Sequence, residues 1–308
     1  MNNSISDVLF AKCGKAVVSI ANEFISLEEG DKIPTVSYLQ EINDCSRGTV
    51  QNAISTLKEI NAIKIEPHGQ SGTILTYKDT KLLLQIIGIN NIVGCMPLPY
   101  SKRYEGLATG LVSTIENSYN IKSSLAFVRG AKNRIEMLLS GRYDYAVVSL
   151  LAAKQFIKEN KDIVIVKELG TGTYTGDHVI IFHDQKETKI RDGMKVGIDD
   201  SSIDQTKLTD IVCKGIKVKK VHLSYSNVLK TIALGNIDCA IWNKDEIYDK
   251  YMNINYQSID KNKDDTIAVI VADKKRKNFI NFLNKVIDEE IVISKQKEVM
   301  DGSLIPTY

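Results

Sequence analysis

The clearest hydrophobic pattern in the chain lies between residues 46 and 58, where apolar residues recur at helical spacing. Four of them stand at positions i, i+3, i+4 and i+7 and form one stripe that can pack on a core. They are Val50, Ala53, Ile54 and Leu57. The hydroxyl of Ser46 can cap the first turn of this helix. The opposite face is polar, and it carries Arg47, Gln51, Asn52, Ser55 and Lys58.

A second helix is predicted just before the first. It begins near Thr35, with Pro34 before it or in its first turn, where the missing amide hydrogen costs nothing. Its apolar residues are expected to face the core, and they are Val36, Leu39 and Ile42. Residues 5–28 also have the apolar pattern of a helix, which can cover the same core.

Residues 63–77 predict a β-hairpin after these helices. Residues 63–66 alternate like a strand, two glycines in residues 68–72 allow a tight turn, and residues 73–77 can pair back. Helices and hairpin in this order predict a winged helix, whose recognition helix fits the major groove of DNA. Arginine, glutamine and asparagine can read base edges, and hydroxyl groups suit phosphates. The predicted DNA contacts are Thr35, Ser37, Ser46, Arg47, Thr49, Gln51, Asn52, Ser55, His68, Gln70 and Ser71.

Three short motifs in residues 10–77 resemble the winged-helix domain of the GntR superfamily of bacterial transcription regulators. They are Ile33-Pro34-Thr35, Ser46-Arg47-Gly48-Thr49-Val50 and Gly69-Gln70-Ser71-Gly72-Thr73. The resemblance implies a regulator that binds double-stranded DNA. The family usually has arginine where Ser37 stands, and often where Gln51 stands, so the preferred DNA site can differ.

The charge of the N-terminal segment opens an alternative. Residues 1–80 hold seven basic and ten acidic residues, whereas the whole chain has a net charge of +2. DNA-binding domains usually present a basic surface. A winged helix that binds another protein is therefore the alternative, unless a dimer concentrates Arg47, Lys58 and Lys64 on one face.

Length and composition narrow the remaining classes. A chain of 308 residues with 43% hydrophobic residues predicts two domains, at 1–80 and 81–308. The five cysteines and four histidines lack the spacing of metal ligands, so no metal or cofactor is expected. No signal-peptide pattern and no apolar run of about 20 residues is present, which favours a cytoplasmic protein without a membrane span.

Beyond residue 80 the pattern changes to apolar runs that alternate with helical segments, which is typical of parallel α/β layers. The predicted strands are 86–93, 124–128, 145–148, 163–166, 179–182, 195–198, 218–223, 239–242 and 267–271. The predicted helices lie near 103–118, 131–140, 150–160, 204–214, 225–235 and 276–290. Residues 79–81 are predicted to be a short connector.

An internal echo divides this α/β domain. Residues 139–147 and 233–241 both run from a helix end through a glycine and an aspartate into a buried strand. The pair resembles the two-lobed type II architecture of periplasmic binding proteins, in which this element recurs in each lobe. The resemblance implies lobes at about 85–176 with 270–308 and at about 177–268. A single domain with a chance echo is the alternative.

A ligand is expected between such lobes, where loops and helix N-termini converge and favour anions. The predicted ligand contacts are Pro97, Tyr100, Arg103, Arg129, Ser149, Thr171, Thr173, Tyr174, Ser201, Ser202 and Trp242. Each has a structural alternative, because serine and threonine often cap helices and a lone tryptophan often belongs to a core. Asp144 and Asp238 are expected to brace turns.

The whole chain resembles the YhfZ-like group of regulators, and the run from Gly30 to Thr35 supports this. We therefore predict a homodimeric, ligand-responsive transcription regulator that senses a small, anionic metabolite. The alternatives are an enzyme on the α/β domain, for which no catalytic motif is visible, and a solute-binding protein for transport, which the missing signal peptide disfavours.

Overall fold

The computed structural model describes residues 12–119, 121–249, 253–260 and 262–308. The chain forms two compact units. The first comprises residues 1–92, 115–122 and 276–286, and the second comprises residues 93–114, 123–275 and 287–308. The first unit thus takes in two stretches from later in the chain. The predicted domain boundary at residue 80 stays a prediction.

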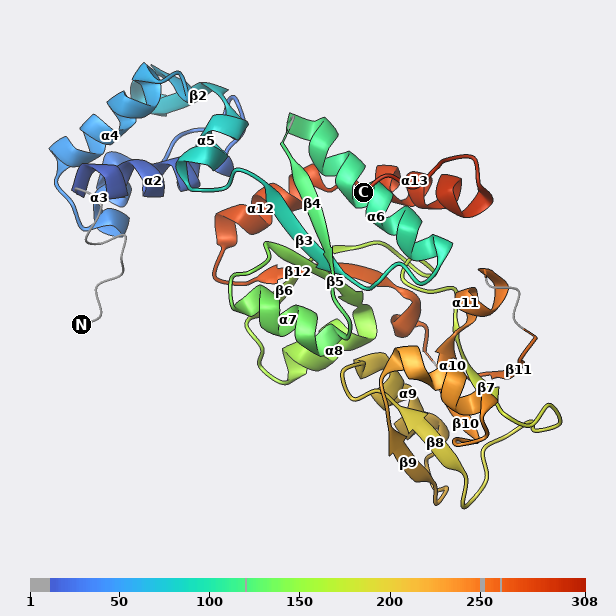
Figure 1. Ribbon diagram of the computed structural model, residues 1–308. Coiled ribbons are helices and arrows are strands. Elements are labelled where there is room, and N and C mark those ends of the chain that lie inside the picture. The colour runs from blue at the N-terminus through green and yellow to red at the C-terminus, as the bar shows by residue number, and fades with distance from the viewer. Residues whose placement is uncertain (1–11, 120, 250–252, 261) are drawn as a thin grey trace. The chain divides into compact units, whose positions relative to one another are not determined.

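The first unit contains the predicted helix-turn-helix. Its helices are α2 (Lys12–Ile25), α3 (Val36–Asn43) and α4 (Arg47–Glu59) (Figure 1). Ser46 caps α4, since its Oγ accepts a hydrogen bond from the amide of Thr49 at 3.2 Å. Val50, Ala53 and Leu57 of α4 are fully buried, which confirms the predicted apolar stripe.

One detail of α3 was predicted wrongly, because Ile42 is 41% exposed instead of facing the core. The helix has only eight residues, and Leu39 is its one buried residue. Thr35 caps its start by accepting from the amide of Tyr38 at 3.2 Å. The chain leaves it through Asp44 in the left-handed conformation, so the last turn of α3 adds nothing to the core.

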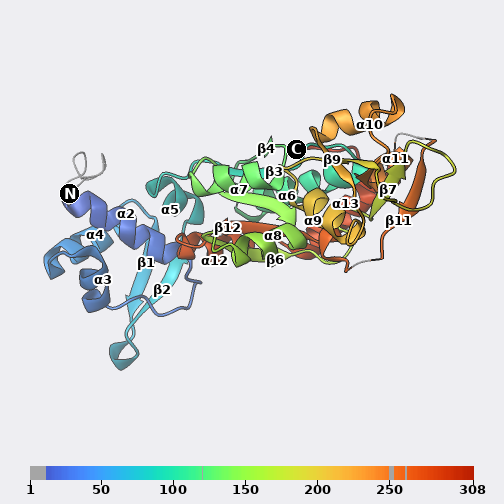
Figure 2. The same cartoon turned by 90° about the horizontal axis from the view of Figure 1, so that it is seen from below.

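The wing is an antiparallel hairpin of β1 (Ile63–Pro67) and β2 (Thr73–Lys78). Figure 2 shows the two strands side by side, with their connecting turn at one end. The turn closes where the amide of His68 donates to the carbonyl of Gly72 at 2.7 Å. Gly72 has φ +91°, a conformation that favours glycine.

Two helices of the first unit depart from the predictions. Residues 79–93 form α5 (Thr80–Ile86) and then β3 (Ile92–Met96), not a connector and one long strand. Asp79 starts α5 by accepting from the amide of Leu82 at 2.9 Å, so most of the predicted connector is helical. The predicted strand at 86–93 covers the end of this helix and a turn, and β3 begins only at Ile92. Near the C-terminus, one helix was predicted to run from residue 276 to residue 290, but α12 (Lys277–Val286) already ends at Val286.

The second unit holds two five-stranded sheets, one in each lobe. Lobe one orders its strands β4-β3-β5-β12-β6, and lobe two orders them β11-β7-β10-β8-β9. Besides β3, these sheets contain β4 (Ser123–Phe127), β5 (Tyr145–Ser149), β6 (Ile163–Glu168), β7 (His178–Phe182), β8 (Lys195–Ile198), β9 (Lys219–His222), β10 (Cys239–Asn243), β11 (Asn255–Ser258) and β12 (Ala268–Asp273).

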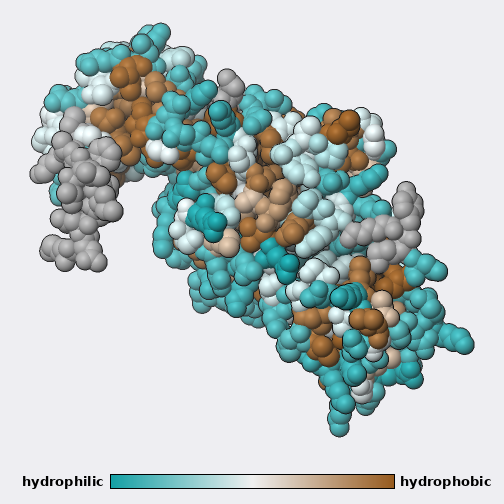
Figure 3. Space-filling view, in the orientation of Figure 1, coloured by the Kyte–Doolittle hydropathy of each residue, from teal (hydrophilic) through white to brown (hydrophobic). Residues whose placement is uncertain are grey.

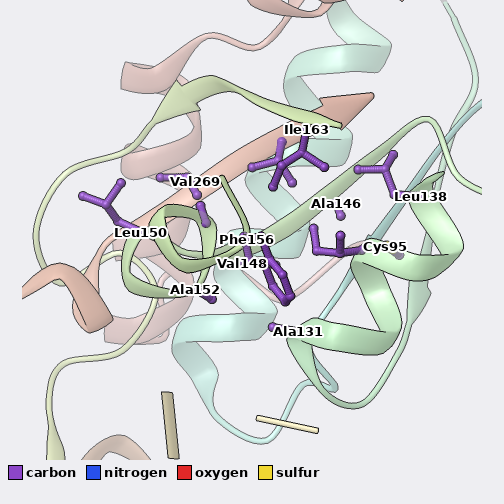
Figure 4. Packing of buried hydrophobic residues seen from close by; sticks show 13 residues of the cluster. Cys95, Ala131, Leu138, Ala146, Val148, Leu150, Ala152, Phe156, Ile163 and Val269 are labelled. Atoms are coloured by element: carbon purple, nitrogen blue, oxygen red, sulfur yellow. The ribbon is translucent and has the colours of Figure 1, made fainter. Parts of the chain in front are cut away.

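Helices cover both sheets. Lobe one has α6 (Lys102–Tyr119), α7 (Ala131–Leu139), α8 (Leu150–Lys158) and α13 (Glu289–Asp301), and lobe two has α9 (Ile203–Val212), α10 (Tyr225–Ala233) and α11 (Lys244–Asp249). Figure 4 shows part of the first core, where Cys95, Val148 and Phe156 gather between the sheet, α7 and α8. Burial of these side chains is the main favourable term in forming the lobe.

Both lobes have the same strand order, which confirms the two-lobed prediction. If the strand that enters from the other lobe is left out of the count (β12 in lobe one, β7 in lobe two), each sheet runs second, first, third, entering strand, fourth. The echoed aspartates do the same job in each. Asp144 Oδ2 accepts from the amide of Val93 at 2.9 Å, and Asp238 Oδ2 accepts from the amide of Lys195 at 2.6 Å. Each therefore ties the turn before the third strand to the start of the first strand.

Candidate functional site

The candidate nucleic-acid interface is the polar face of α4. Arg47, Gln51, Asn52 and Ser55 are exposed on it, while the opposite face is buried. Ser46 and Thr49 lie at its first turn, where their hydroxyl oxygens are 3.0 Å apart. The arrangement leaves one arginine and two amides free to meet the edges of base pairs.

The other predicted DNA contacts flank this face in sequence. Thr35 and Ser37 are exposed at the start of α3, and His68 and Gln70 are exposed in the wing turn. The side chain of Ser71 lies outside the described residues. Their contact with DNA stays a prediction.

A second candidate site is a cavity of about 70 Å³ between the two lobes of the second unit. Lobe one contributes Pro97, Leu98, Tyr100, Tyr104, Arg129, Gly130, Ala131 and Arg134. Lobe two contributes Asp199, Ser201, Ser202, Asp204, Gln205, Tyr225 and Asn243, and Tyr174 and His178 come from the first crossover between the lobes and the start of β7. Six of the predicted ligand contacts are therefore brought together, namely Pro97, Tyr100, Arg129, Tyr174, Ser201 and Ser202.

The five other predicted ligand residues lie outside the cavity lining. Arg103 pairs across the lobes with Asp245 through Nε–Oδ2 and Nη2–Oδ1 contacts of 2.8 and 3.1 Å. Trp242 is buried and stacks on Tyr225 with ring centroids 4.0 Å apart. The remaining three are Ser149, which donates to Asp204, Thr173, which donates to the carbonyl of Gly170, and Thr171, which is exposed.

The serine loop after β8 is held by one carboxylate. Asp199 Oδ1 accepts from the amide and the hydroxyl of Ser201 at 2.9 and 2.6 Å, and its Oδ2 accepts from the amide of Tyr225 at 2.8 Å. Ser202 caps α9 by accepting from the amide of Gln205 at 3.3 Å. The loop is thus fixed before any ligand arrives, and the N-terminus of α9 faces the cavity.

The lobes meet directly at the rim of the cavity. Gly130 has φ +75°, and a Cβ there would lie 2.5 Å from Ser201 Oγ. The amide of Lys132 donates to the carbonyl of Ser201 at 3.4 Å. Tyr100 and Tyr225 face each other with ring centroids 5.4 Å apart. Glycine is therefore required at residue 130 for this closed arrangement.

Arg134, Asp204 and Asn243 are three of the polar residues in the cavity wall that were not predicted as ligand contacts. Arg134 is only 2% exposed, and its guanidinium donates to the carbonyls of Val147 and Val128 and to the hydroxyl of Tyr174. Asp204 accepts from Ser149 Oγ at 2.5 Å, and burial raises the pKa of its carboxyl. The third is Asn243, at the end of β10.

A signal for the first of these was available in the sequence. Arg134 stands on the buried stripe of α7 between Ala131, Ile135 and Leu138, where a charged residue is unusual. Asp204 and Asn243 carried no such signal, because a polar residue at a helix start or strand end is ordinary. Only the crossing of the lobes brings all three to one cavity.

His178 adds a buried hydrogen-bonded side chain to the cavity wall. Its Nδ1 lies 2.6 Å from Asp265 Oδ2, so this pair joins the start of β7 to the second crossover between the lobes. Within the described ranges, no group of three or more histidines, cysteines or acidic residues is placed to hold a metal ion.

Two surface properties complete the description. Among the described helices, none combines the length and apolar character that a bilayer crossing needs. Figure 3 shows mixed hydrophilic and hydrophobic residues on one face, and the exposed apolar residues of lobe two include Ile211, Leu234 and Tyr248. Such scattered exposure is normal for a protein surface.

Comparison with known proteins gives two family matches. Residues 79–308 match the YhfZ C-terminal domain, and residues 28–75 match a helix-turn-helix domain. The protein YhfZ of Escherichia coli (strain K12) is 34% identical over 305 residues, which cover 96% of this chain and 98% of that protein.

Solved structures show the same relationship. The crystal structure of YhfZ from Shigella flexneri is 35% identical, with a TM-score of 0.61 over 75% of this chain and 98% of that chain. The periplasmic VFT2 domain of BvgS from Bordetella pertussis is 14% identical, with a TM-score of 0.50 over 68% of this chain and 93% of that chain. The latter is a likeness of fold alone. With the strand order, it shows that the C-terminal part resembles periplasmic binding protein folds.

Proposed function

We propose that this chain, which belongs to the YhfZ family, is a transcription regulator that binds DNA through α4 and its wing and a small molecule through the interlobe cavity. The helix-turn-helix domain suggests a DNA-binding regulator, and the C-terminal domain resembles solute-binding folds. The observation that carries the proposal is the exposed face of α4. It presents Arg47, Gln51 and Asn52 together on a helix whose other face is buried.

A homodimer suits this role, because two recognition helices can then occupy successive half-sites of a palindromic operator. The ligand would favour the closed lobes over open ones and so shift the population of states that bind DNA. A GntR-like winged helix, a dimer and a cytoplasmic location are all parts of this proposal.

Charge and geometry support a ligand with an anionic group. Arg129 and Arg134 both line the cavity. The first turns of α7 and α9 face it as well, and helix N-termini attract anions through free amides and the helix dipole.

An enzyme on the same cleft is the main alternative. A hydroxyl nucleophile needs a base within hydrogen-bond reach. Ser149 donates to the carboxylate of Asp204, but Ser149 is fully buried and is not part of the cavity lining, and His178 pairs with Asp265. Among the described residues no hydrogen bond joins Ser149 to His178, so the geometry favours binding. Turnover of a bound metabolite that is lost on changing Arg129 or Ser202 would support the enzyme.

Selection of binding sequences from random duplex DNA tests the proposal. The full chain should enrich a palindrome, and Arg47→Ala should lose that enrichment. Arg142→Ala is the control, since it removes an exposed arginine from the second unit. If the wild type enriches nothing over bulk DNA at moderate salt, the regulator proposal fails. The acidic winged helix would then be an interaction module.

A further inference from the structure

The interlobe cavity is lined by two buried, oppositely charged side chains that do not pair with each other. Arg134 comes from α7 in lobe one and Asp204 from α9 in lobe two, and they are 2% and 5% exposed. Both residues are described, and no ion pair within 4.0 Å joins them. A buried charge without a close counter-charge is costly, so an opposite charge on a bound ligand would stabilise each side chain.

The positive side has unused donors. A guanidinium has five N–H groups, and Arg134 uses three of them on the carbonyls of Val147 and Val128 and the hydroxyl of Tyr174. None of these acceptors carries a formal charge. Two N–H groups remain for an anionic acceptor.

Asn243 supplies another unused donor. Its Oδ1 accepts from Thr175 Oγ1 at 2.6 Å and from the amide of Asp245 at 2.9 Å, which fixes the orientation of the side-chain amide. Its Nδ2 is buried, without a hydrogen-bond partner among the described residues, in a side chain that lines the cavity and is 3% exposed overall. A buried amide of this kind calls for an acceptor on a ligand.

The negative side is equally incomplete. The one hydrogen bond described for Asp204 is the one from Ser149 to Oδ1. His178 lies in its neighbourhood, but the ring of His178 is already held by Asp265. Burial raises the pKa of Asp204, and the opposing influence of His178 and Arg134, which lie near it, offsets only part of that rise. An ammonium group beside it would offset that effect.

We infer that the cavity binds a small zwitterion, whose carboxylate takes the donors of Arg134 and Asn243 and whose ammonium faces Asp204; this rests on the proposed ligand-binding role of the cleft. A simple anion would satisfy Arg134 but face the carboxylate of Asp204. A simple amine would satisfy Asp204 but leave Arg134 uncompensated. The volume of about 70 Å³ has room for roughly five water molecules, so small zwitterions are the first probes.

Trp242 gives a direct readout of binding. It is the only tryptophan in the chain, and it stacks on Tyr225, which lines the cavity. Its fluorescence is titrated in the full chain with the zwitterions glycine, L-alanine and 3-aminopropanoate. The matched probes are propionate, ethylamine and inorganic phosphate. We expect at least one zwitterion to bind at least tenfold more tightly than each of these three.

Two near-isosteric variants test the two ends of the ligand. Asn243→Asp keeps the Oδ1 contacts but replaces the unused donor by a carboxylate oxygen, so zwitterion affinity should fall tenfold or more. Asp204→Asn keeps the acceptor for Ser149 but removes the charge, so zwitterion affinity should fall while propionate affinity rises. Asn236→Asp is the control, because it adds the same negative charge at an exposed turn just before β10 begins, whereas Asn243 stands at the end of β10.

The inference is overturned if propionate, ethylamine or phosphate binds as tightly as every zwitterion, or if none of the zwitterions binds. A rise in propionate affinity for Asp204→Asn cannot come from misfolding, so that variant separates recognition from stability. The regulator proposal is tested separately by DNA selection. If DNA selection enriches an operator while the cavity prefers propionate, the zwitterion inference fails and the regulator proposal stands.

Discussion

Removing the Arg103–Asp245 contact should weaken the closed lobes by about 2 kcal/mol. The guanidinium makes two bonds to the carboxylate, at 2.8 and 3.1 Å, and a third to the carbonyl of Gly172. The paired side chains are only 16% and 14% exposed. Charge-assisted, bidentate bonds that are shielded from water exceed the roughly 0–1 kcal/mol of a surface pair, and coupling energies of this kind reach about 0.5–3 kcal/mol.

A double-mutant cycle isolates this energy. Arg103→Met, Asp245→Asn and the double variant are unfolded in urea and followed by the fluorescence of Trp242, which reports on the second unit. The matched control is Arg191→Met, because Arg191 pairs with Glu187 but its side chain is 62% exposed. We expect a change within about 0.5 kcal/mol for the control.

The cycle also decides the role of Arg103, which the sequence predicted as a ligand contact. A coupling energy below about 0.5 kcal/mol would contradict this prediction, since the two side chains would then contribute to stability independently. A coupling near the predicted value makes Arg103 a lock between the lobes. Any loss of ligand affinity in Arg103→Met should then also appear in Asp245→Asn.

Three further predictions concern stability and reactivity. Gly110→Ala should lower the melting temperature, because the new Cβ would meet the backbone oxygen of Val292 at 2.7 Å. Gly48→Ala has space for the new Cβ and should gain up to about 1 kcal/mol of helix propensity. Equal shifts of the melting temperature in the two variants would contradict this. Ser46→Ala should cost about 1 kcal/mol in urea unfolding through the lost cap, and no change would show that the cap is dispensable. Burial raises the pKa of Cys95 to about 12, so iodoacetamide at pH 8 should label half-buried Cys45 before Cys95, as followed by mass spectrometry, and early labelling of Cys95 would contradict its burial.

The sequence predicted those elements whose pattern is local. The stripe of α4, its Ser46 cap and the glycines of the wing turn all lie within a few residues of one another, and the helix, the cap and the turn were confirmed. The predicted strand at 86–93 was mostly wrong, since only residues 92–93 of it lie in β3, and a short apolar run does not by itself distinguish a strand from a helix end and a turn. The exposure of Ile42 depends on where α3 stops.

The candidate cavity was predicted only in part, for a physical reason. Loops that follow strands are visible in the sequence, so Arg129 and Ser201 could be placed at a cleft. Arg134, Asp204 and Asn243 stand in three different elements from two lobes. Their side chains line one cavity only after the lobes have folded and closed, and no spacing along the chain encodes that arrangement.

The most direct test of the account is the coupling between the cavity and DNA. Fluorescence anisotropy measures the affinity of the full chain for the enriched duplex, with and without the small molecule that the Trp242 titration identifies, in wild type and Asn243→Asp. We expect the DNA affinity of the wild type to change about fivefold or more, and that of the variant not to change, at the same ligand concentration. Equal DNA affinity of the wild type with the cavity saturated and empty would contradict a ligand-responsive regulator.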